Sequence, residues 1–341
     1  MRHVVIEEPG QVHVTEAPDP ELPGADGAVI DVTASAICGS DLHFYEGEIP
    51  FAPGMALGHE FIGRVAEVGT EVRRFSVGDR VLVASVAGCG HCDGCATGDP
   101  VTCVHGPQVF GSGVLPGGQA SAVAVHSADF QLLAIPDDVT DDAALLMTDN
   151  LNTGWAAAKR ADIPPGGTVL VLGLGAVGQC AVRAALALGA GTVLAADPVA
   201  GRRKLAADSG ATPLTGTTVE GAMEATNGRG VDAVIDAVAL NSSLDDAFAC
   251  VRAAGTISVV GVHDLSPYPL PILLGLFRSL TLRLTTAPVH QTWKELMPMV
   301  RSGRLPTGGI MTHEFPLAAA AEGYALAAAR SPDCLKIMLR P

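Results

Sequence analysis

Four of the eight cysteines in this sequence fall within fifteen residues, in the stretch CGHCDGCATGDPVTC at 89–103. The spacing C-x2-C-x2-C-x7-C is typical of thiolates that close around one metal ion, and four thiolates suit a structural zinc. Neighbouring glycines let the backbone turn tightly around such an ion. An iron–sulfur cluster also takes four cysteines, but ferredoxin spacings differ in the last step, and free or redox thiols are the remaining alternative. We therefore expect a structural zinc held by Cys89, Cys92, Cys95 and Cys103.

A second set of chemically capable residues is scattered through the first half of the chain. CGSDLH contains Cys38, Ser40, Asp41 and His43, GHE contains His59 and Glu60, and TDNLNTG contains Asp149 and Thr153. Cysteine, histidine and carboxylate together suit a catalytic zinc that keeps one coordination position open. Taken singly, each residue has a simpler explanation: a small buried cysteine, a hydrogen-bonded histidine, or a helix cap at Asp149. The prediction of a catalytic metal therefore depends on their joint occurrence.

A glycine-rich turn in the second half indicates a dinucleotide site. The stretch from Thr168 to Asp197 reads as a β-rich run, then GLGAVG, then an apolar helix and a second apolar strand that ends at an acid. Gly173, Gly175 and Gly178 occupy the G-x-G-x-x-G frame, in which the helix N-terminus binds the pyrophosphate. A glycine-rich turn in another α/β fold is the alternative, but the strand, helix and acid around the motif favour the dinucleotide site.

The elements that must position these residues differ between the two halves. Apolar strands are expected at Val231–Asp236, Thr256–Gly261 and Leu280–Leu284, separated by helical patterns such as Ser243–Arg252, which is typical of a doubly wound parallel sheet. The first 150 residues hold short β-rich runs with frequent glycine and proline, at Ala28–Ala34, Ile62–Val68 and Arg80–Ala84. We expect an α/β protein with a β-rich part followed by the parallel sheet.

Composition excludes several classes of function. A chain of 341 residues with 48% hydrophobic and 17% charged residues is globular, and its net charge of −15 opposes a broad phosphate-binding surface, so nucleic acid is not an expected partner. The most apolar stretch, at 163–182, is broken by prolines and glycines and makes a poor membrane span. The opening residues MRHVVIEEPG lack the apolar core of a signal peptide, so a cytoplasmic location with reduced thiols is expected.

Over essentially its whole length the chain resembles the zinc-dependent medium-chain alcohol dehydrogenases. GHEFIGRVAEVG at 58–69 is similar to the zinc signature of that family, and the four-cysteine loop and GLGAVG lie where the family carries its structural zinc and its dinucleotide. The resemblance implies a discontinuous GroES-like catalytic domain at 1–153 and 293–341, and a Rossmann NAD-binding domain at 154–292. It also implies an NAD-dependent alcohol dehydrogenase with two zinc ions per chain, one catalytic and one structural.

The resemblance also implies roles for single residues. Cys38, His59 and Asp149 would bind the catalytic zinc, Glu60 would be an adjacent carboxylate able to coordinate it, and Asp41 would hold His59. Ser40 and His43 would form the proton relay; the alternative is that Ser40 caps a short helix and His43 bonds nearby backbone. The cofactor-binding residues would be Thr153, Gly173, Gly175, Ala176, Val177, Gly178, Asp197, Arg202, Val238, Val260, Gly261, Val262 and Lys336, the last reaching the pyrophosphate. The pocket walls would be Ser40, Ser85, Val86 and Phe110.

The sequence gives weaker indications of the cofactor preference and of the substrate than of the metal and dinucleotide sites. Asp197 favours NAD over NADP, although Arg202 and Arg203 follow it and arginine suits the extra phosphate. APVHQTWKEL at 287–296 and MTHEFPL at 311–317 resemble the formaldehyde-dehydrogenase-like and secondary-alcohol-dehydrogenase-like bacterial branch. The alternatives are a polyol, amino-alcohol or formaldehyde-type dehydrogenase, and a non-catalytic cofactor-binding protein. The family resemblance implies a small-molecule alcohol or carbonyl substrate and a homotetramer or homodimer.

Overall fold

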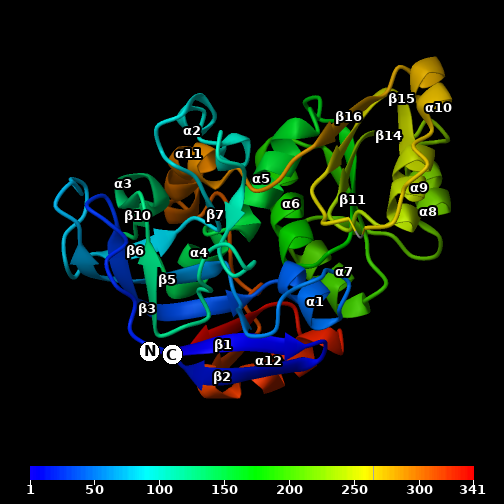
Figure 1. The fold of residues 1–341 in the computed structure, drawn as a ribbon. Coiled ribbons are helices and arrows are strands. Elements are labelled where there is room, and N and C mark those ends of the chain that lie inside the picture. Colours follow the sequence, from blue (N-terminus) through cyan, green and yellow to red (C-terminus); the bar gives the residue numbers. More distant parts are fainter. Residues whose placement is uncertain (264) are drawn as a thin grey trace. The chain divides into compact units, whose positions relative to one another are not determined.

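The computed structural model of the protein describes residues 1–263 and 265–341, and the chain divides into two compact units. The first unit comprises Met1–Asn152, Ala287–Gly303 and Thr307–Pro341, and the second comprises Thr153–Thr286 with Arg304–Pro306. The chain thus returns to the first unit at Ala287, earlier than the expected residue 293. In Figure 1 the blue N-terminal strands and the red C-terminal strand both belong to the first unit.

The first unit is built mainly from antiparallel β-sheet. Its strands are β1 (Arg2–Glu8), β2 (Gln11–Glu16), β3 (Ala28–Ile37), β4 (Met55–Ala56), β5 (Glu60–Val68), β6 (Arg80–Val83), β7 (Val86–Ala87), β8 (Gln108–Val109), β9 (Ala122–Val125), β10 (Leu132–Ala134), β17 (His313–Pro316) and β18 (Ile337–Arg340). One sheet has the order β2-β1-β4, a larger one has the order β10-β6-β5-β3-β18-β17 with β9 also paired to β3, and β7 pairs with β8.

Apolar side chains on one face of the larger sheet explain why these strands form. In β3, exposed Asp31 and Thr33 alternate with buried Ile30, Val32 and Ala34, which is the period of a strand with one face on a core. Phe61 of β5 joins the same core cluster. The sheet therefore has a fixed register, and its strand ends are fixed with it.

The pairing of β3 brings three distant segments together. Ala36 of β3 lies opposite Glu60 of β5, and Ile37 lies opposite Ile337 of β18. The residues just beyond these pairs are Cys38, His59 and Lys336. The sheet therefore places the end of β3, the start of β5 and the start of β18 side by side.

Short helices complete the first unit. They are α1 (Gly39–Tyr45), α2 (Asp93–Ala96), α3 (Ala128–Gln131), α4 (Asp141–Leu146), α11 (Val289–Arg301) and α12 (Ala320–Ala328), with the 3-10 helices η1 (Pro100–Thr102) and η2 (Leu317–Ala319). Helix α5 (Asn150–Arg160) begins in the first unit and continues into the second. Over the described part of the chain, no helix has both the length and the apolar character needed to cross a bilayer.

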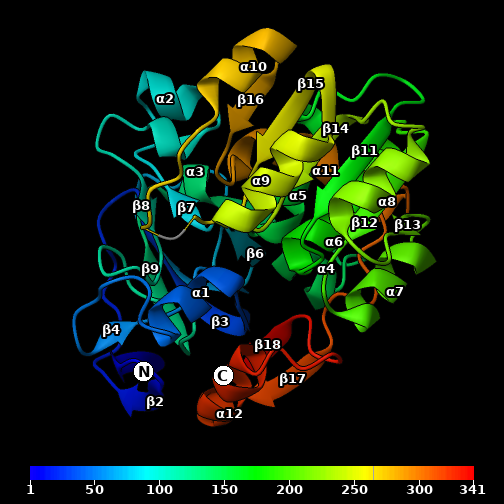
Figure 2. The same ribbon diagram turned by 90° about the vertical axis from the view of Figure 1, so that its right-hand side faces the viewer.

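The second unit is a parallel sheet with helices between its strands. The strands are β11 (Thr168–Leu172), β12 (Thr192–Ala196), β13 (Thr212–Pro213), β14 (Val231–Asp236), β15 (Val251–Val259) and β16 (Thr281–Leu284), and the helices are α6 (Ala176–Ala187), α7 (Ala200–Asp208), α8 (Thr218–Ala225), α9 (Asn241–Cys250) and α10 (Ile272–Arg278). The strand order is β13-β12-β11-β14-β15-β16, and every pairing is parallel. This is the doubly wound order 3-2-1-4-5-6 of dinucleotide-binding folds. Helix α6 packs on β11 and β12, and α9 packs on β14 and β15 (Figure 2).

Candidate metal and dinucleotide sites

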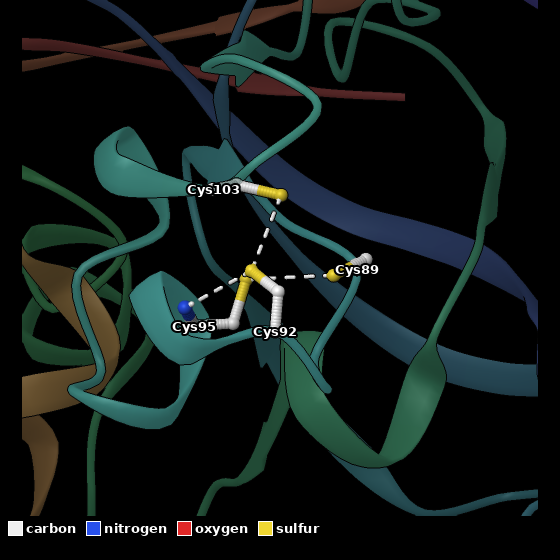
Figure 3. A group of neighbouring side chains, drawn as sticks. All are labelled: Cys89, Cys92, Cys95 and Cys103. Carbon is white, nitrogen blue, oxygen red and sulfur yellow. Dashed lines mark hydrogen bonds between the residues drawn. The ribbon is translucent and has the colours of Figure 1, made fainter.

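The four cysteines of the 89–103 loop surround one point in the first unit (Figure 3). The Sγ atoms of Cys89 and Cys95 are 3.9 Å apart, and so are those of Cys92 and Cys103. Zinc–sulfur bonds of about 2.3 Å in a regular tetrahedron place the sulfur atoms about 3.8 Å apart. The loop therefore has the dimensions of a tetrahedral zinc site.

The protonation of these thiols also fits a cation. Backbone N–H groups of Cys95 and Val104 lower the pKa of Cys92 to about 6, whereas burial raises the pKa of Cys95 to about 12. Contacts with the neighbouring sulfurs raise the pKa of Cys95 further, because negative charge on one sulfur disfavours charge on the next. A divalent cation offsets that repulsion and allows all four sulfurs to ionise.

Local packing holds the four-cysteine loop in this shape. A Cβ atom on Gly94 would lie 2.0 Å from the carbonyl oxygen of Thr102, so α2 and η1 approach closely only because residue 94 is glycine. The N–H of Gln291 in α11 donates to the carbonyl of Gly98 at 3.0 Å. The side chain of Gln131 donates to the carbonyl of Gly88 at 3.3 Å. The loop is thus anchored at its start and near its middle.

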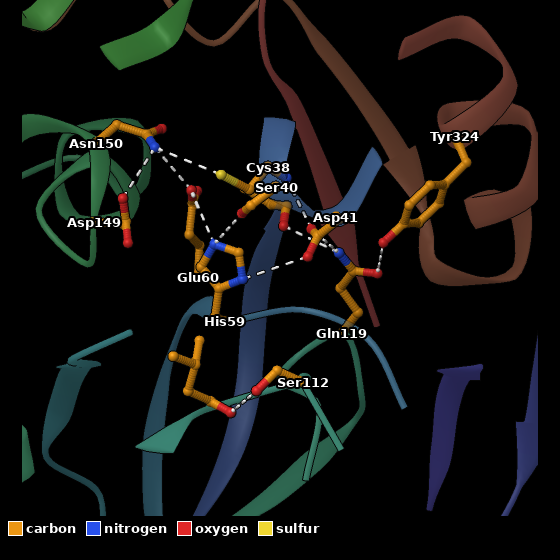
Figure 4. A network of polar contacts seen from close by, with 12 residues as sticks. Cys38, Ser40, Asp41, His59, Glu60, Ser112, Gln119, Asp149, Asn150 and Tyr324 are labelled. Atoms are coloured by element: carbon orange, nitrogen blue, oxygen red, sulfur yellow. Dashed lines mark hydrogen bonds and ion pairs between the residues drawn. The ribbon is translucent and has the colours of Figure 1, made fainter. Parts of the chain in front are cut away.

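A second cluster of potential metal ligands lies at the adjoining ends of β3 and β5. One ligand atom each from Cys38, His59 and Glu60 lies within 4.8 Å of the others (Figure 4). Thiolate, imidazole and carboxylate are the donor types that zinc takes in proteins, and His59 and Glu60 are buried. The residues present therefore fit a zinc ion.

The orientation of His59 is set by two neighbours. Its Nδ1 lies 3.4 Å from Oδ1 of Asp41, and its Nε2 lies 3.3 Å from Oγ of Ser40. Burial alone would lower the pKa of His59, but the charges of Asp41 and Cys38 outweigh it and raise the pKa well above its ordinary value. The helix cap belongs to Cys38, whose N–H donates to Asp41 at 2.9 Å, and not to Ser40. The Ser40 hydroxyl is therefore not used as the helix cap, and it lies beside His59 of the ligand cluster.

Lys336, expected to reach the pyrophosphate, lies beside Glu60. Its Nζ is 2.7 Å from Oε1 and 2.6 Å from Oε2 of Glu60, and the two side chains are 2% and 0% exposed. Burial lowers the pKa of Lys336, but Glu60, with Cys38 and Asp149, outweighs this and raises the pKa. Its ammonium group is therefore buried against Glu60, which favours a role beside this carboxylate over the expected contact with a pyrophosphate.

Asp149 is only indirectly part of the compact cluster. The side chain of Asn150 donates to Oε1 of Glu60 at 2.9 Å and lies 3.5 Å from Oδ1 of Asp149 and 4.0 Å from Sγ of Cys38. Asn150 thus stands between three of the expected ligands, a role that a single asparagine in the sequence did not reveal. Thr153, expected beside the nicotinamide, lies one turn further along α5 and is buried.

His43, the expected outer member of the proton relay, has a carboxylate partner. Its Nδ1 is 2.5 Å from Oε2 of Glu48. The N–H groups of Glu48 and Ile49 both donate to the carbonyl of His43, at 2.8 and 3.2 Å, which folds the segment after α1 back onto the histidine. The imidazole therefore bonds the Glu48 carboxylate through Nδ1, while the backbone bonds go to the His43 carbonyl.

The glycine-rich turn of the second unit has the shape of a phosphate cradle. Gly173 has φ +78°, and a Cβ on Gly178 would lie 1.8 Å from the carbonyl oxygen of Gly173, so the turn and the strand–helix packing both require glycine. A Cβ on Gly175 would meet no atom within 4 Å, which leaves open space at the N-terminus of α6. Ala176 and Val177 begin that helix, where N–H groups favour an anion.

Asp197 follows β12 directly and lies beside the glycine-rich turn. Its Oδ2 accepts the N–H of Leu174 at 2.8 Å, and its Oδ1 accepts the N–H of Val199 at 2.7 Å. Nη1 of Arg202 is 3.7 Å from Oδ2, while the guanidinium of Arg203 donates to the carbonyls of residues 197 and 198. Both guanidinium groups therefore lie at the carboxyl end of β12.

The other expected cofactor residues also lie at the carboxyl ends of the parallel strands. Val238 follows β14, and its side chain packs against Gly173, where a Cβ would lie 2.3 Å away. Val260, Gly261 and Val262 follow β15, and Gly261 lies against the backbone of Val238. This edge of a doubly wound sheet is where such folds bind ligands.

The expected pocket walls fall into two groups. Ser85 and Val86 are fully buried at the start of β7. Phe110 is also fully buried and packs edge-to-face on Phe61 with ring centroids 5.2 Å apart, within the core cluster. The structure therefore assigns Phe110 to the hydrophobic core of the first unit.

Two family models match the chain. Residues 24–137 match the alcohol dehydrogenase GroES-like domain, and residues 176–302 match the zinc-binding dehydrogenase model. A protein of Mycobacterium tuberculosis named as a zinc-binding alcohol dehydrogenase is 58% identical over the whole of this chain and 89% of its own length.

Solved structures give the same result. The alcohol dehydrogenase of Thermus sp. ATN1 superposes with a TM-score of 0.93 at 34% identity, covering 100% of this chain and 99% of the other. A dehydrogenase of Sinorhizobium meliloti described as zinc-binding, with NADP bound, has a TM-score of 0.85 at 28% identity, covering 100% and 99%. The GroES-like and Rossmann architecture expected from the sequence is confirmed.

Proposed function

The chain belongs to the family of zinc-binding alcohol dehydrogenases with a GroES-like domain, and we propose that it transfers a hydride between a small alcohol and NAD with two zinc ions per chain. It is an oxidoreductase of the medium-chain dehydrogenase superfamily, with an NAD(P)-binding second unit. The observation that carries the proposal is the convergence of Cys38, His59 and Glu60 beside the Ser40 hydroxyl.

In this proposal Cys38, His59 and Asp149 hold the catalytic zinc, with Glu60 adjacent, and the four-cysteine loop holds the structural one. The catalytic ion, when bound, supplies the Lewis acidity that makes an alcohol a stronger acid, and the nicotinamide supplies the hydride acceptor. Asp41 accepts from Nδ1 of His59 and leaves Nε2 for the ion.

The chain's own residues then have to move one proton out of the site. The Ser40 hydroxyl, 3.3 Å from Nε2 of His59, both accepts and donates and can take the proton of the alcohol. His43 then passes the proton to water, since an imidazole has one nitrogen that accepts a proton and another that donates one. Glu48 accepts from Nδ1 of His43, which leaves Nε2 as the basic nitrogen.

Lys336 and Asn150 act on Glu60 and not on the substrate. Lys336 neutralises the buried carboxylate, and Asn150 donates a further hydrogen bond to it. The Glu60 carboxyl group therefore has a cationic partner and an amide partner beside Cys38 and His59.

The choice of NAD over NADP depends on Asp197. The carboxylate lies at the strand end where a ribose diol is bound in this fold, and it would repel a 2′-phosphate. The guanidinium of Arg203 donates to backbone carbonyls, and that of Arg202 lies near the Asp197 carboxylate. Both arginines would have to give up these contacts in order to bind a 2′-phosphate. A relative from Sinorhizobium meliloti was solved with NADP bound, so the preference for NAD is proposed for the present chain and not for all of its relatives.

An exposed apolar face supports a homo-oligomer, a dimer or a tetramer. Helix α10 buries none of its residues, and Leu276 and Phe277 are 71% and 83% exposed. Strand β16, which carries exposed Leu284, ends the six-stranded order among the residues that the structure describes. Exposed apolar surface beside a sheet edge favours pairing, and a two-fold contact between copies covers both at once. Sedimentation of Phe277→Asp beside the parent protein tests this: a smaller particle is expected, and an unchanged one would refute the assignment.

The compartment and substrate branch are further parts of the proposal. A loop of four reduced thiols suits the cytoplasm. The formaldehyde-dehydrogenase-like and secondary-alcohol branch follows from residues 287–296 and 311–317 alone.

A substrate panel tests the proposed function. Primary alcohols, secondary alcohols and polyols are offered with NAD and with NADP, and the reduced nicotinamide is followed by its absorbance. We expect NAD reduction with a subset of alcohols, its loss after zinc removal by a chelator, and its recovery when zinc is restored. Cofactor binding without turnover on any alcohol or carbonyl would instead favour a non-catalytic binding protein.

A further inference from the structure

A buried chain of polar side chains runs from α12 to the metal-binding histidine. The hydroxyl of Tyr324 donates to Oε1 of Gln119 at 2.9 Å, Nε2 of Gln119 donates to Oδ2 of Asp41 at 3.1 Å, and Oδ1 of Asp41 lies 3.4 Å from Nδ1 of His59 (Figure 4). All four residues are buried, and Tyr324 and Gln119 are 0% exposed. Neither Tyr324 nor Gln119 belongs to the site described above.

Both ends of the Gln119 amide are fixed. Its Nε2 donates to the carbonyl of Ala36 at 3.2 Å as well as to Asp41. Burial and the charge of Asp41 raise the pKa of Tyr324 well above its ordinary value, so the phenol stays protonated and can donate to Oε1. A reversed amide would place Oε1 against the Asp41 carboxylate and leave the phenol without an acceptor. Tyr324 therefore selects the amide orientation that Asp41 needs.

The backbone around Gln119 is also attached to the segment that carries His59. The N–H of Gln119 donates to the carbonyl of Leu57 at 3.1 Å. Gly58 has φ +97°, and a Cβ there would lie 2.4 Å from Cγ of Gln119. Because residue 58 is glycine, the Gln119 side chain can pack directly against the backbone of the residue that precedes His59.

We propose that Gln119 and Tyr324 are positioning residues for the catalytic metal site. Oδ2 of Asp41 is occupied by Gln119 and by the N–H of Cys38, so Oδ1 remains for His59. A carboxylate fixed on Nδ1–H orients the ring and keeps Nε2 as the lone pair for a metal. The inference rests on the proposed zinc at Cys38 and His59, and it adds two residues that set its affinity.

The test measures zinc release from each of the two sites in the zinc-loaded protein, by competition with a coloured chelator. Gln119→Leu keeps the volume and removes both polar ends, and we expect about 10- to 100-fold weaker binding at the Cys38 site. Tyr324→Phe removes one hydroxyl, and we expect about two- to tenfold weaker binding. Because the two act in series, Tyr324→Phe should add little in the Gln119→Leu background.

Two controls separate positioning from general loss of stability. The four-cysteine site of the same chain should bind zinc as tightly in every variant as it does in the parent protein. Tyr45→Phe removes a hydroxyl from the ring that stacks on Tyr324 with centroids 5.5 Å apart, and it should release zinc as the parent protein does. Tyr324→Phe, which deletes one oxygen atom, keeps the test valid if Gln119→Leu does not fold.

Unchanged release from the Cys38 site in Tyr324→Phe and in folded Gln119→Leu would overturn the inference, and so would equal weakening of both sites. A parent protein that binds zinc only in the four-cysteine loop would overturn the proposed function itself, and the inference with it.

Discussion

Replacing Lys336 with methionine removes the cation from a fully buried ion pair. The Nζ atom lies within 2.7 Å of both Glu60 oxygens, and Asn150 gives Oε1 one further hydrogen bond. Methionine keeps the length of the side chain but leaves a buried carboxylate without its counter-charge, which costs about 3 to 5 kcal/mol. At about 1.4 kcal/mol per factor of ten, the unfolding equilibrium of the first unit rises roughly a hundred- to five-thousand-fold.

Urea denaturation of the zinc-loaded protein measures this cost. Lys336→Met combined with Glu60→Gln removes the charge on both sides, and the double variant should regain most of the loss, because neutral replacement of a buried pair is often tolerated. Lys204→Met is the matched control, since its pair with Asp208 is exposed and should change stability by less than about 1 kcal/mol. The KM for NAD should stay unchanged in Lys336→Met.

A loss below about 1 kcal/mol for the single variant, or a double variant no more stable than the single one, would refute the ion-pair assignment. A large rise in the KM for NAD at unchanged stability would return Lys336 to the pyrophosphate role that the family resemblance implied.

Four further variants test other parts of the account. Ser40→Ala should cut turnover severely with zinc retained, and His43→Gln should slow oxidation roughly 10- to 1,000-fold, most at low pH where hydroxide cannot substitute; an unchanged pH–rate profile would remove the relay. The parent protein should have the higher kcat/KM with NAD, and Asp197→Ser should narrow the preference; equal values with NADP in the parent protein would contradict the cofactor assignment. Hydrogen bonds from Arg229 lower the pKa of Asp232 below its ordinary 3.8, so its stabilisation is present above that pH and is lost as the pH falls; Asp232→Asn should be less sensitive to acid in a pH series of melting curves, and equal sensitivity would refute it.

The parallel sheet was the part of the fold that the sequence predicted best. Strands Thr168–Leu172 and Val231–Asp236 have the expected bounds, because continuous apolar runs between turn residues leave little choice of length. The strand expected at Thr256–Gly261 begins earlier, at Val251. Its first residues include arginine, alanine and glycine, so they lack the apolar run that indicates a strand in this sheet. Boundaries set by burial on both faces were thus predictable, and boundaries set by pairing with a neighbour were not.

The candidate site was predictable where one short segment holds its residues. The four cysteines and the glycine-rich turn lie within single loops, so their spacing in the sequence already limits their distances in space. Lys336 differs, since its partner Glu60 is 276 residues away and the pairing of β3 with both β18 and β5 brings them together.

Some supporting residues carried no signal in the sequence at all. Asn150, Gln119 and Tyr324 are ordinary polar residues whose roles depend on where their side chains end in the folded core. Phe110 was expected at a pocket wall, but packing against Phe61 decides its position. Such roles follow from tertiary contacts, which spacing along the chain does not encode.

Zinc content and turnover, measured together in Cys38→Ser and Cys89→Ser, test the central claim most directly. The active parent protein should contain two zinc ions per chain. Cys38→Ser should retain one zinc ion, a near-parent thermal stability and no alcohol oxidation, whereas Cys89→Ser should lose the other ion and unfold at a lower temperature. Full turnover in Cys38→Ser, or an active parent protein without zinc, would contradict the account.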